Sequence, residues 1–281
     1  MKPPASARRT RPYVALLVLA TALLAACGGG ARTAAVPSLQ PTSVTTQATS
    51  PARTPFVVAI SAGHGGPQNV GAVHTNTEGA VDLVEKDLNL DVARRLDALL
   101  RADGYRTILI RDGDYSLAPP VPDFNESVRL ESQARADIAN AAGADIILAL
   151  HFNGSDDAAQ SGTEVYYNPD RAFGDRSRML ATFVDESLLA GIRALGYDTR
   201  DRGIMNDASI GARFDQAHTF LLGEAAGFRP TEMPGVICEP LFVSNDVEAA
   251  LLQRDDMRQA IAAAYKAGID RYVRWLEGGE G

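Results

Sequence analysis

The sequence predicts a single α/β domain in which a mostly parallel sheet is flanked by helices. Short apolar, β-branched runs alternate along the chain with longer segments whose apolar residues recur at helical spacing. Several of the short runs are apolar throughout, as in strands that are covered on both faces, which favours parallel pairing. The 281 residues, of which 46% are hydrophobic and 22% charged, have an ordinary globular composition.

The first expected strand covers residues 56–60 and stops at a glycine-rich turn over residues 61–66. Residues 87–100 then place apolar side chains three and four positions apart, and Gly104 follows as a stop signal. The beginning of the domain is therefore expected to be a strand, a loop and a helix packed on the sheet.

The same alternation continues toward the end of the chain, with no internal repeat. Residues 197–234 are less regular and rich in Gly, Asp and Arg, so we treat them as an insertion. The further strands are expected at 106–110, 145–150, 165–167 and 235–238, and the further helices at 127–142, at 177–195 and within 247–276.

The first 27 residues are interpreted as a lipoprotein signal peptide. Basic residues precede an apolar run, 14–26, that is short for a membrane span, and the run ends in Leu-Ala-Ala-Cys, which resembles a lipobox with Cys27 as the lipidated residue. An ordinary signal peptide with an incidental cysteine, or a short signal anchor, is the alternative.

Residues 28–55 are rich in Gly, Ser, Thr and Pro and are expected to be a disordered tether. The catalytic domain then spans 56–277.

The charge and the cysteines exclude some classes of protein. The formal charge is −8, and without the four basic residues of the signal segment 23 basic residues face 35 acidic ones, or −12. Nucleic acid and an electrostatically held membrane surface both need a basic face, so neither partner is expected. With Cys27 lipidated, Cys238 has no disulfide partner, and its apolar neighbours indicate a core position.

Polar residues of the kinds that bind metals stand at the ends of three expected strands. His64 follows the first strand, and His151 and Glu239 directly follow two others. Ligand sites form where the strands of such sheets end, and a catalytic zinc takes three ligands from His, Asp and Glu. Glu85, at the start of the first helix, is the candidate third ligand, although an acidic residue there also favours the helix dipole. Each residue alone is explained equally well as a polar strand or helix cap.

Five segments in sequence resemble the zinc-dependent N-acetylmuramoyl-L-alanine amidases of peptidoglycan (amidase type 3). They are SAGHGG (61–66), EKDLNL (85–90), ARADIAN (134–140), LHFNG (150–154) and EPLFVSN (239–245). The resemblance implies an α/β domain, zinc ligation by His64, Glu85 and His151, and catalysis by Glu239.

The function that the resemblance implies is hydrolysis of the amide between N-acetylmuramic acid and L-alanine. Zinc would polarise the carbonyl and acidify its water, while Glu239 accepts the proton and passes it to the leaving nitrogen. Peptidoglycan would be the substrate of a protein secreted across the inner membrane and held in the cell envelope by its lipid.

Some positions depart from the family pattern or extend it. Phe152 replaces a small residue and is expected to narrow the groove. His74 and His218 have no counterpart and are assigned to the surface or to the surroundings of the site. Arg135 matches a family arginine, but a structural ion pair explains it equally well.

Some family members carry a helix that covers the zinc until an activator protein displaces it. Residues 208–222 are the candidate for such a helix, with Glu224 or Glu232 capping the metal.

Two other functions are compatible with these residues. A zinc peptidoglycan peptidase uses the same ligand types, and it differs from an amidase in cutting within the stem peptide. A wall-binding lipoprotein without catalysis is the other alternative, but the retention of all four expected functional residues argues against it.

Overall fold

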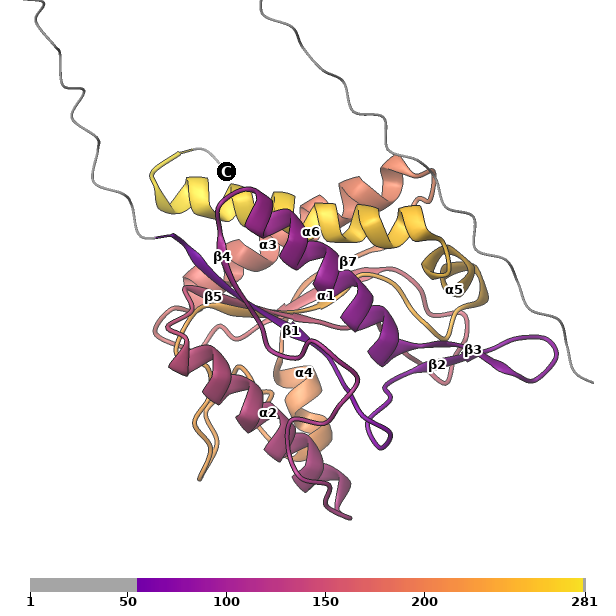
Figure 1. The fold of residues 1–281 in the computed structure, drawn as a ribbon, viewed down its shortest axis with the longest axis horizontal. Helices are drawn as coiled ribbons and strands as arrows, with labels where there is room; N and C mark the ends of the chain where they lie inside the picture. Colours follow the sequence, from indigo (N-terminus) through magenta and orange to yellow (C-terminus); the bar gives the residue numbers. More distant parts are fainter. Residues whose placement is uncertain (1–54, 280–281) are drawn as a thin grey trace, which may run out of the picture. The chain divides into compact units, whose positions relative to one another are not determined.

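The computed structural model describes residues 55–279 (Figure 1). The predicted signal peptide, the lipidation site at Cys27 and nearly all of the predicted tether lie outside these residues. Within residues 55–279, no helix has both the length and the apolar character that a membrane span requires.

A six-stranded sheet forms the centre of the domain, in the order β4-β1-β5-β8-β6-β7. All neighbouring strands are parallel except β6 and β8, which run antiparallel. The predicted α/β fold with a mostly parallel sheet is confirmed. The strands of this sheet are β1 (Val57–Ala62), β4 (Arg106–Leu109), β5 (Ile146–Leu150), β6 (Thr163–Tyr167), β7 (Asp201–Asn206) and β8 (Gly235–Glu239).

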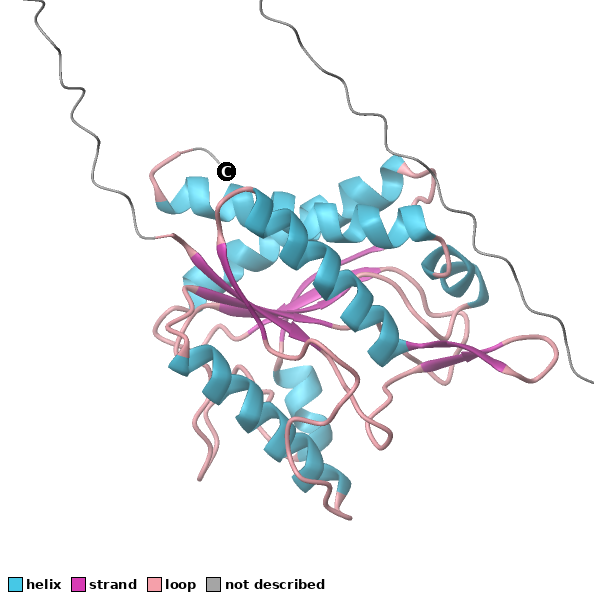
Figure 2. Ribbon diagram, viewed as in Figure 1, coloured by secondary structure: helices cyan, strands magenta, loops and turns pink. Residues whose placement is uncertain are grey.

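Helices cover both faces of the sheet and divide the core into two layers (Figure 2). α1, α3 and α6 bury the larger apolar cluster on one face, whereas α2 and part of the chain after β7 bury the smaller cluster on the other. The longer helices are α1 (Glu85–Ala102), α2 (Phe124–Ala141), α3 (Gly174–Ala194), α5 (Asp246–Leu252) and α6 (Asp255–Leu276).

Two regions differ from the sequence-based expectation. A hairpin of β2 (Val73–Thr75) and β3 (Val81–Val84) precedes α1, and β7 lies in the segment that is predicted to be an irregular insertion. The predicted helix over 208–222 is wrong beyond its first turns. Only α4 (Ala208–Gly211) and the 3-10 helix η1 (Ala212–Phe214) form, because Asp215 turns the backbone with a φ of 55°.

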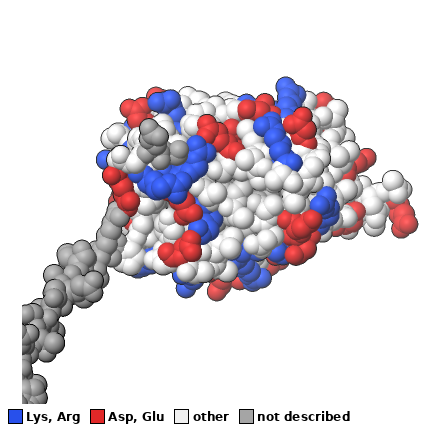
Figure 3. All heavy atoms as spheres, turned by 90° about the horizontal axis from the view of Figure 1, so that it is seen from above, with Lys and Arg blue, Asp and Glu red and all other residues white. Residues whose placement is uncertain are grey.

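Charged side chains of both signs are interspersed on the face formed by α1, α3 and α6 (Figure 3). Several pair directly: Arg95 with Asp91 at 3.0 Å, Arg258 with Asp91 at 2.7 Å and Arg271 with Glu186 at 2.7 Å. On this face the acidic excess does not produce an uninterrupted patch of one sign.

Cys238 lies in the middle of the larger apolar cluster, with none of its surface exposed. Burial raises the pKa of its thiol well above the usual value, and the carboxylates of Glu239 and Asp185 add to the effect. The prediction of a core role for Cys238 is confirmed.

Candidate metal centre

Three adjacent parallel strands deliver the predicted site residues to one edge of the sheet. In the order β1-β5-β8, His64 lies two residues beyond β1, His151 directly follows β5, and Glu239 is the last residue of β8. Glu85 is the first residue of α1. The sheet order thus brings together residues that are as far apart in sequence as 64 and 239.

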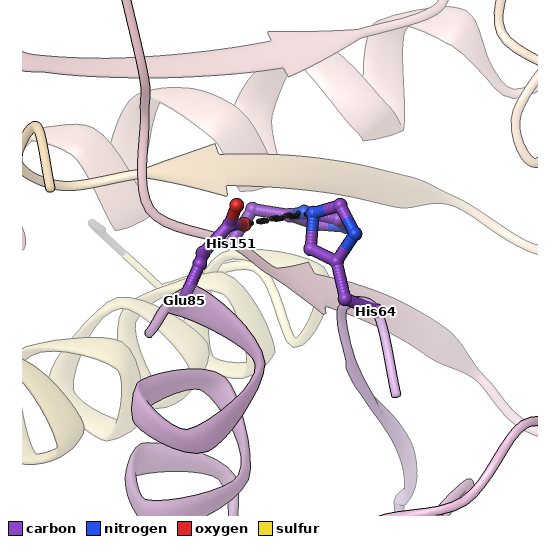
Figure 4. Close-up of side chains that lie close together, drawn as sticks. All are labelled: His64, Glu85 and His151. Atoms are coloured by element: carbon purple, nitrogen blue, oxygen red, sulfur yellow. Dashed lines mark hydrogen bonds and ion pairs between the residues drawn. The ribbon is translucent and has the colours of Figure 1, made fainter. Parts of the chain in front are cut away.

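The side chains of His64, Glu85 and His151 point toward one another (Figure 4). His64 Nε2 and His151 Nδ1 each lie 3.0 Å from the same carboxylate oxygen, Glu85 Oε1. Ligand atoms of the three residues all lie within 4.8 Å of one another. Glu85 is 5% exposed, whereas the two histidines are 24% and 25% exposed, so the group is reachable from solvent on the histidine side.

Neighbouring polar atoms fix the orientation of these side chains. His64 Nδ1 lies 2.6 Å from Asn69 Oδ1, which leaves Nε2 to face the centre when Nδ1 carries the proton. Glu85 Oε2 accepts a 2.7 Å hydrogen bond from the backbone N–H of Ala72, and Oε1 accepts a 3.2 Å bond from that of Phe152.

Two glycines make room for the cluster. A Cβ atom at Gly63 would overlap the imidazole of His151, and one at Gly71 would overlap the carboxylate of Glu85. Gly71 also has a φ of 73°, in the left-handed region that favours glycine. The loops can approach the side chains of His151 and Glu85 so closely only because these positions lack side chains.

Two buried arginines hold the backbone of the turn after β1. Arg111 donates hydrogen bonds of 3.0 and 2.8 Å to the carbonyls of Ala62 and Gly63. Arg135 donates to the carbonyls of Ala62 and His64 at 2.6 and 2.7 Å. Its ion pair with Glu131 is longer, at 3.6 Å, so the structure favours a backbone-holding role for the family-matched Arg135.

The charges of the centre fit a cation. Burial raises the pKa of Glu85, but the two imidazoles outweigh this effect and hold it well below its usual range. Burial lowers the pKa of His151, which favours the neutral, ligating form of this ring. For His64, the lowering effect of burial is outweighed by Glu85, so its pKa is raised. One carboxylate and two imidazoles are the donor set that a catalytic zinc takes.

Glu239 lies beside this cluster and shares a cavity with it. Its Oε2 atom is shielded from solvent and has no hydrogen-bond partner among residues 55–279. Burial raises its pKa well above the usual range, and the carboxylates of Glu85 and Glu164 raise it further. Glu164 is the register partner of Glu239 on the antiparallel strand β6.

A cavity of about 250 Å³ opens from the centre toward α2 and the segment after β7. His64, His151 and Glu239 line one side of the cavity. Residues of α2 and of the segment after β7 line the opposite wall. The cavity is also lined by Phe124, Arg135, Arg213, Phe214 and Phe220. The segment of residues 197–234 therefore borders the site.

Two expectations about the surroundings of the site are wrong. Glu224 does not cap the centre, because its side chain is 79% exposed and pairs with Arg171 at 3.6 Å. Glu232 is also exposed, and neither glutamate lines the cavity. Phe152 does not narrow the groove, because its side chain is 2% exposed and packs in the apolar core.

The remaining histidines take no part in the centre. His74 lies on the β2–β3 hairpin between Asp82 and Asp246, and His218 lies between Asp207 and Asp170. Neither belongs to the cluster of His64, Glu85 and His151.

Comparison with known proteins decides the family. The sequence profile described as N-acetylmuramoyl-L-alanine amidase matches residues 58–271, a range that includes His64, Glu85, His151 and Glu239. The chain belongs to this amidase family. The resemblance, the fold and the enzyme class predicted from the sequence are thereby confirmed.

The chain is similar to further proteins in sequence and in fold. LytC of Bacillus subtilis, an N-acetylmuramoyl-L-alanine amidase, is 28% identical over 237 residues, which cover 83% of this chain but 39% of LytC. The uncharacterized protein YqiI of the same organism is 30% identical over 215 residues, covering 76% of this chain and 84% of YqiI. The CwlD amidase from Clostridioides difficile, solved in complex with the GerS lipoprotein, has the same fold, with a TM-score of 0.62 at 23% identity, over 78% of this chain and 99% of CwlD.

Proposed function

We propose that this chain hydrolyses the amide between N-acetylmuramic acid and L-alanine in peptidoglycan, with zinc held by His64, Glu85 and His151. The convergence of both imidazoles on one carboxylate oxygen is the observation that carries the proposal. Zinc in such a site supplies Lewis-acid chemistry, since it polarises a carbonyl and makes a water molecule more acidic.

The protein's own residues supply the proton transfer and the positioning. Glu239, whose pKa is raised, accepts the proton of the attacking water and delivers it to the leaving alanine nitrogen. The same carboxyl group thus takes a proton in the first step and releases it in the second. Asn69, Arg111 and Arg135 keep the turn and its imidazole in place while this occurs.

The test combines metal analysis with product analysis on the folded chain. We expect about one zinc per chain, strongly reduced by His64→Ala and retained by Glu239→Gln, which is expected to lose activity by about a thousandfold or more. Mass spectrometry of digested muropeptides should show a free lactyl carboxylate and a free alanine amine. Cuts within the stem peptide would indicate a peptidase instead, and a folded protein without zinc or cleavage would support the wall-binding alternative.

The N-terminal sequence and the family support a proposal about the location and the partners of the protein. An extracytoplasmic location suits an amidase of the cell wall. We infer that Cys27 carries a lipid and that residues 28–55 tether the domain to a membrane of the envelope, so that it reaches peptidoglycan. A protein activator stays a prediction, which the complex of CwlD with GerS supports.

A further inference from the structure

Two arginines line the cavity beside the centre, and they differ in what they contact. Arg135 is 6% exposed, and its guanidinium donates to Ser61 Oγ, to two backbone carbonyls and toward Glu131. Arg213, on η1 in the opposite wall, is exposed and makes no hydrogen bond or ion pair within residues 55–279. Of the two guanidinium groups, that of Arg213 is therefore the one available to a ligand.

Arg213 lies close enough to the reacting groups to influence them. Its positive charge acts on the carboxyl of Glu239 and on the hydroxyl of Tyr166, opposing the rise in the pKa of both groups. Because Glu239 faces the scissile amide in the proposed function, a group bound by Arg213 belongs to the substrate near that amide.

The wall around Arg213 is apolar and aromatic. Phe214 stacks on Phe124 of α2, with ring centroids 6.4 Å apart and an angle of 27° between planes, and Phe220 lies 5.9 Å from Phe214. Aromatic rings beside a guanidinium displace water and strengthen a charge-assisted hydrogen bond. Phe124 is 67% exposed, so this aromatic group extends from the cavity to the surface.

A carboxylate is the ligand that this arrangement favours. A guanidinium binds carboxylates through two parallel N–H···O bonds, a geometry that an uncharged carboxamide matches poorly. In a peptidoglycan stem, the residue after the leaving alanine is an acidic D-amino acid joined through its side chain, and its α-carboxyl group is either free or amidated. One residue spans about 3.6 Å at most, so this group follows the scissile amide closely and enters the same cavity that Glu239 and Arg213 line.

We propose that Arg213 binds the α-carboxylate of the second stem residue and makes the enzyme selective for stems in which this carboxylate is free. The inference rests on the proposed amidase function, for which it specifies the substrate class. Arg213 is thus a specificity-determining residue on the segment after β7.

The first experiment uses two probes that differ only at this group. They are N-acetylmuramoyl-L-alanyl-D-glutamate, with a free α-carboxylate, and N-acetylmuramoyl-L-alanyl-D-isoglutamine, its α-carboxamide; both keep a free γ-carboxylate. We expect the zinc-loaded chain to cleave the free acid with a kcat/KM about tenfold or more above that of the amide. Arg213→Gln should bring this ratio to about one, mainly through KM, and Arg213→Lys should retain part of it.

The control replaces an exposed arginine outside the cavity. Arg178, on α3 in the opposite helical layer, makes no side-chain hydrogen bond or ion pair within residues 55–279, and Arg178→Gln should keep the wild-type ratio. If Arg213 acted only on the pKa of Glu239, Arg213→Gln would change kcat for both probes equally and shift the pH profile. An unchanged ratio in Arg213→Gln, or a wild-type ratio near one, would overturn the inference.

A binding measurement separates this inference from the proposed function. In Glu239→Gln protein, calorimetric titration should give a tighter Kd for the free acid than for the amide, and the added Arg213→Gln change should remove the difference. Equal affinities would refute the inference even if the wild type is an active amidase. A clear preference in binding, with no cleavage by the wild type, would instead refute the proposed function.

Discussion

At the scale of single residues, the turn after β1 shows a backbone held in an unfavourable conformation. His64 has a φ of 58°, a left-handed value that is uncommon outside glycine and costs on the order of 1–3 kcal/mol. Its own carbonyl and those of the two preceding residues accept hydrogen bonds from Arg111 and Arg135. The arginines therefore offset the strain that aims the imidazole at Glu85.

Asn69 provides a direct test of how the centre is oriented. Asn69→Ala removes the acceptor for His64 Nδ1, so we expect zinc affinity to fall about 10- to 100-fold, as for other lost partners of ligating histidines. Competition with a chromophoric chelator measures the affinity, and a thermal scan of the metal-free protein should show little change.

Two variants calibrate this result. Asn69→Asp keeps an acceptor and should lose less affinity, and Gln68→Ala, at the exposed neighbouring position, should match the wild type. Equal zinc affinity in Asn69→Ala and the wild type would show that His64 needs no such partner.

The sequence identified the residues at the strand ends but not those that support them. His64, His151 and Glu239 were found because each follows an apolar run, and Glu85 because it starts a helix. Asn69 and Arg111 carry no such signal. Asn69 acts from a loop whose course depends on the positive φ of Gly65, Gly66 and Gly71, and Arg111 acts on carbonyls 48 and 49 positions earlier.

At the scale of elements, a cluster of charged residues stabilises the segment after β7, which lines the cavity. Asp207 is fully buried and accepts hydrogen bonds from the backbone N–H and the hydroxyl of Thr219, at 2.9 and 2.7 Å. His218 bridges Asp207 at 2.6 Å and Asp170 at 3.0 Å. The two ends of the α4–η1 turn are thus joined just outside the wall that carries Arg213.

This cluster predicts a pH dependence of stability. Burial lowers the pKa of His218, but the two carboxylates outweigh this effect and raise it above the usual value. Its contribution to stability is therefore complete below the unfolded pKa of about 6.5 and is lost as pH rises through the folded pKa. We therefore expect His218→Gln to lower the free energy of unfolding by more at about pH 6 than at about pH 9.

Chemical denaturation at both pH values measures this difference. Gln216→Ala lies in the same segment but changes no titrating group. It should lower the free energy of unfolding by the same amount at each pH. If the loss in the free energy of unfolding caused by His218→Gln does not change with pH, the assignment of a charged imidazole is contradicted.

The sequence pattern does not predict the strands whose side chains are largely exposed or alternate irregularly between polar and apolar. β7 pairs with one neighbour at the edge of the sheet, and its residues Asp201, Arg202 and Gly203 break any apolar pattern. The β2–β3 hairpin is largely exposed and packs little of its surface. By contrast, β1 and β5 are buried along their whole length, and their apolar runs predicted them within two residues.

At the scale of the whole molecule, the site depends on strand order rather than on any one element. β1, β5 and β8 are neighbours and parallel, so their carboxyl ends meet at one edge. The sequence predicted the α/β class because buried parallel strands are apolar throughout. It did not predict the antiparallel placement of β6 against β8, which sets Glu164 beside Glu239.

The proposed lipid anchor also belongs to this scale. Cys27→Ser removes the residue that would be modified, so we expect the chain to leave the membrane fraction for the soluble fraction. Labelling with a radioactive fatty acid, followed by fractionation, measures this change. A Cys27→Ser chain that stays in the membrane fraction would indicate an uncleaved signal anchor.

The buried position of Cys238 affects how the domain withstands oxidation outside the cytoplasm. Oxidants and disulfide exchange act on an accessible thiolate, and this thiol is both enclosed and held in its protonated form. If Cys27 is lipidated, the mature chain offers no reactive sulfhydryl in an oxidising compartment. The domain then needs neither a disulfide-forming catalyst to mature nor a reductant to persist, and the absence of crosslinked dimers on a non-reducing gel is its simplest biochemical sign.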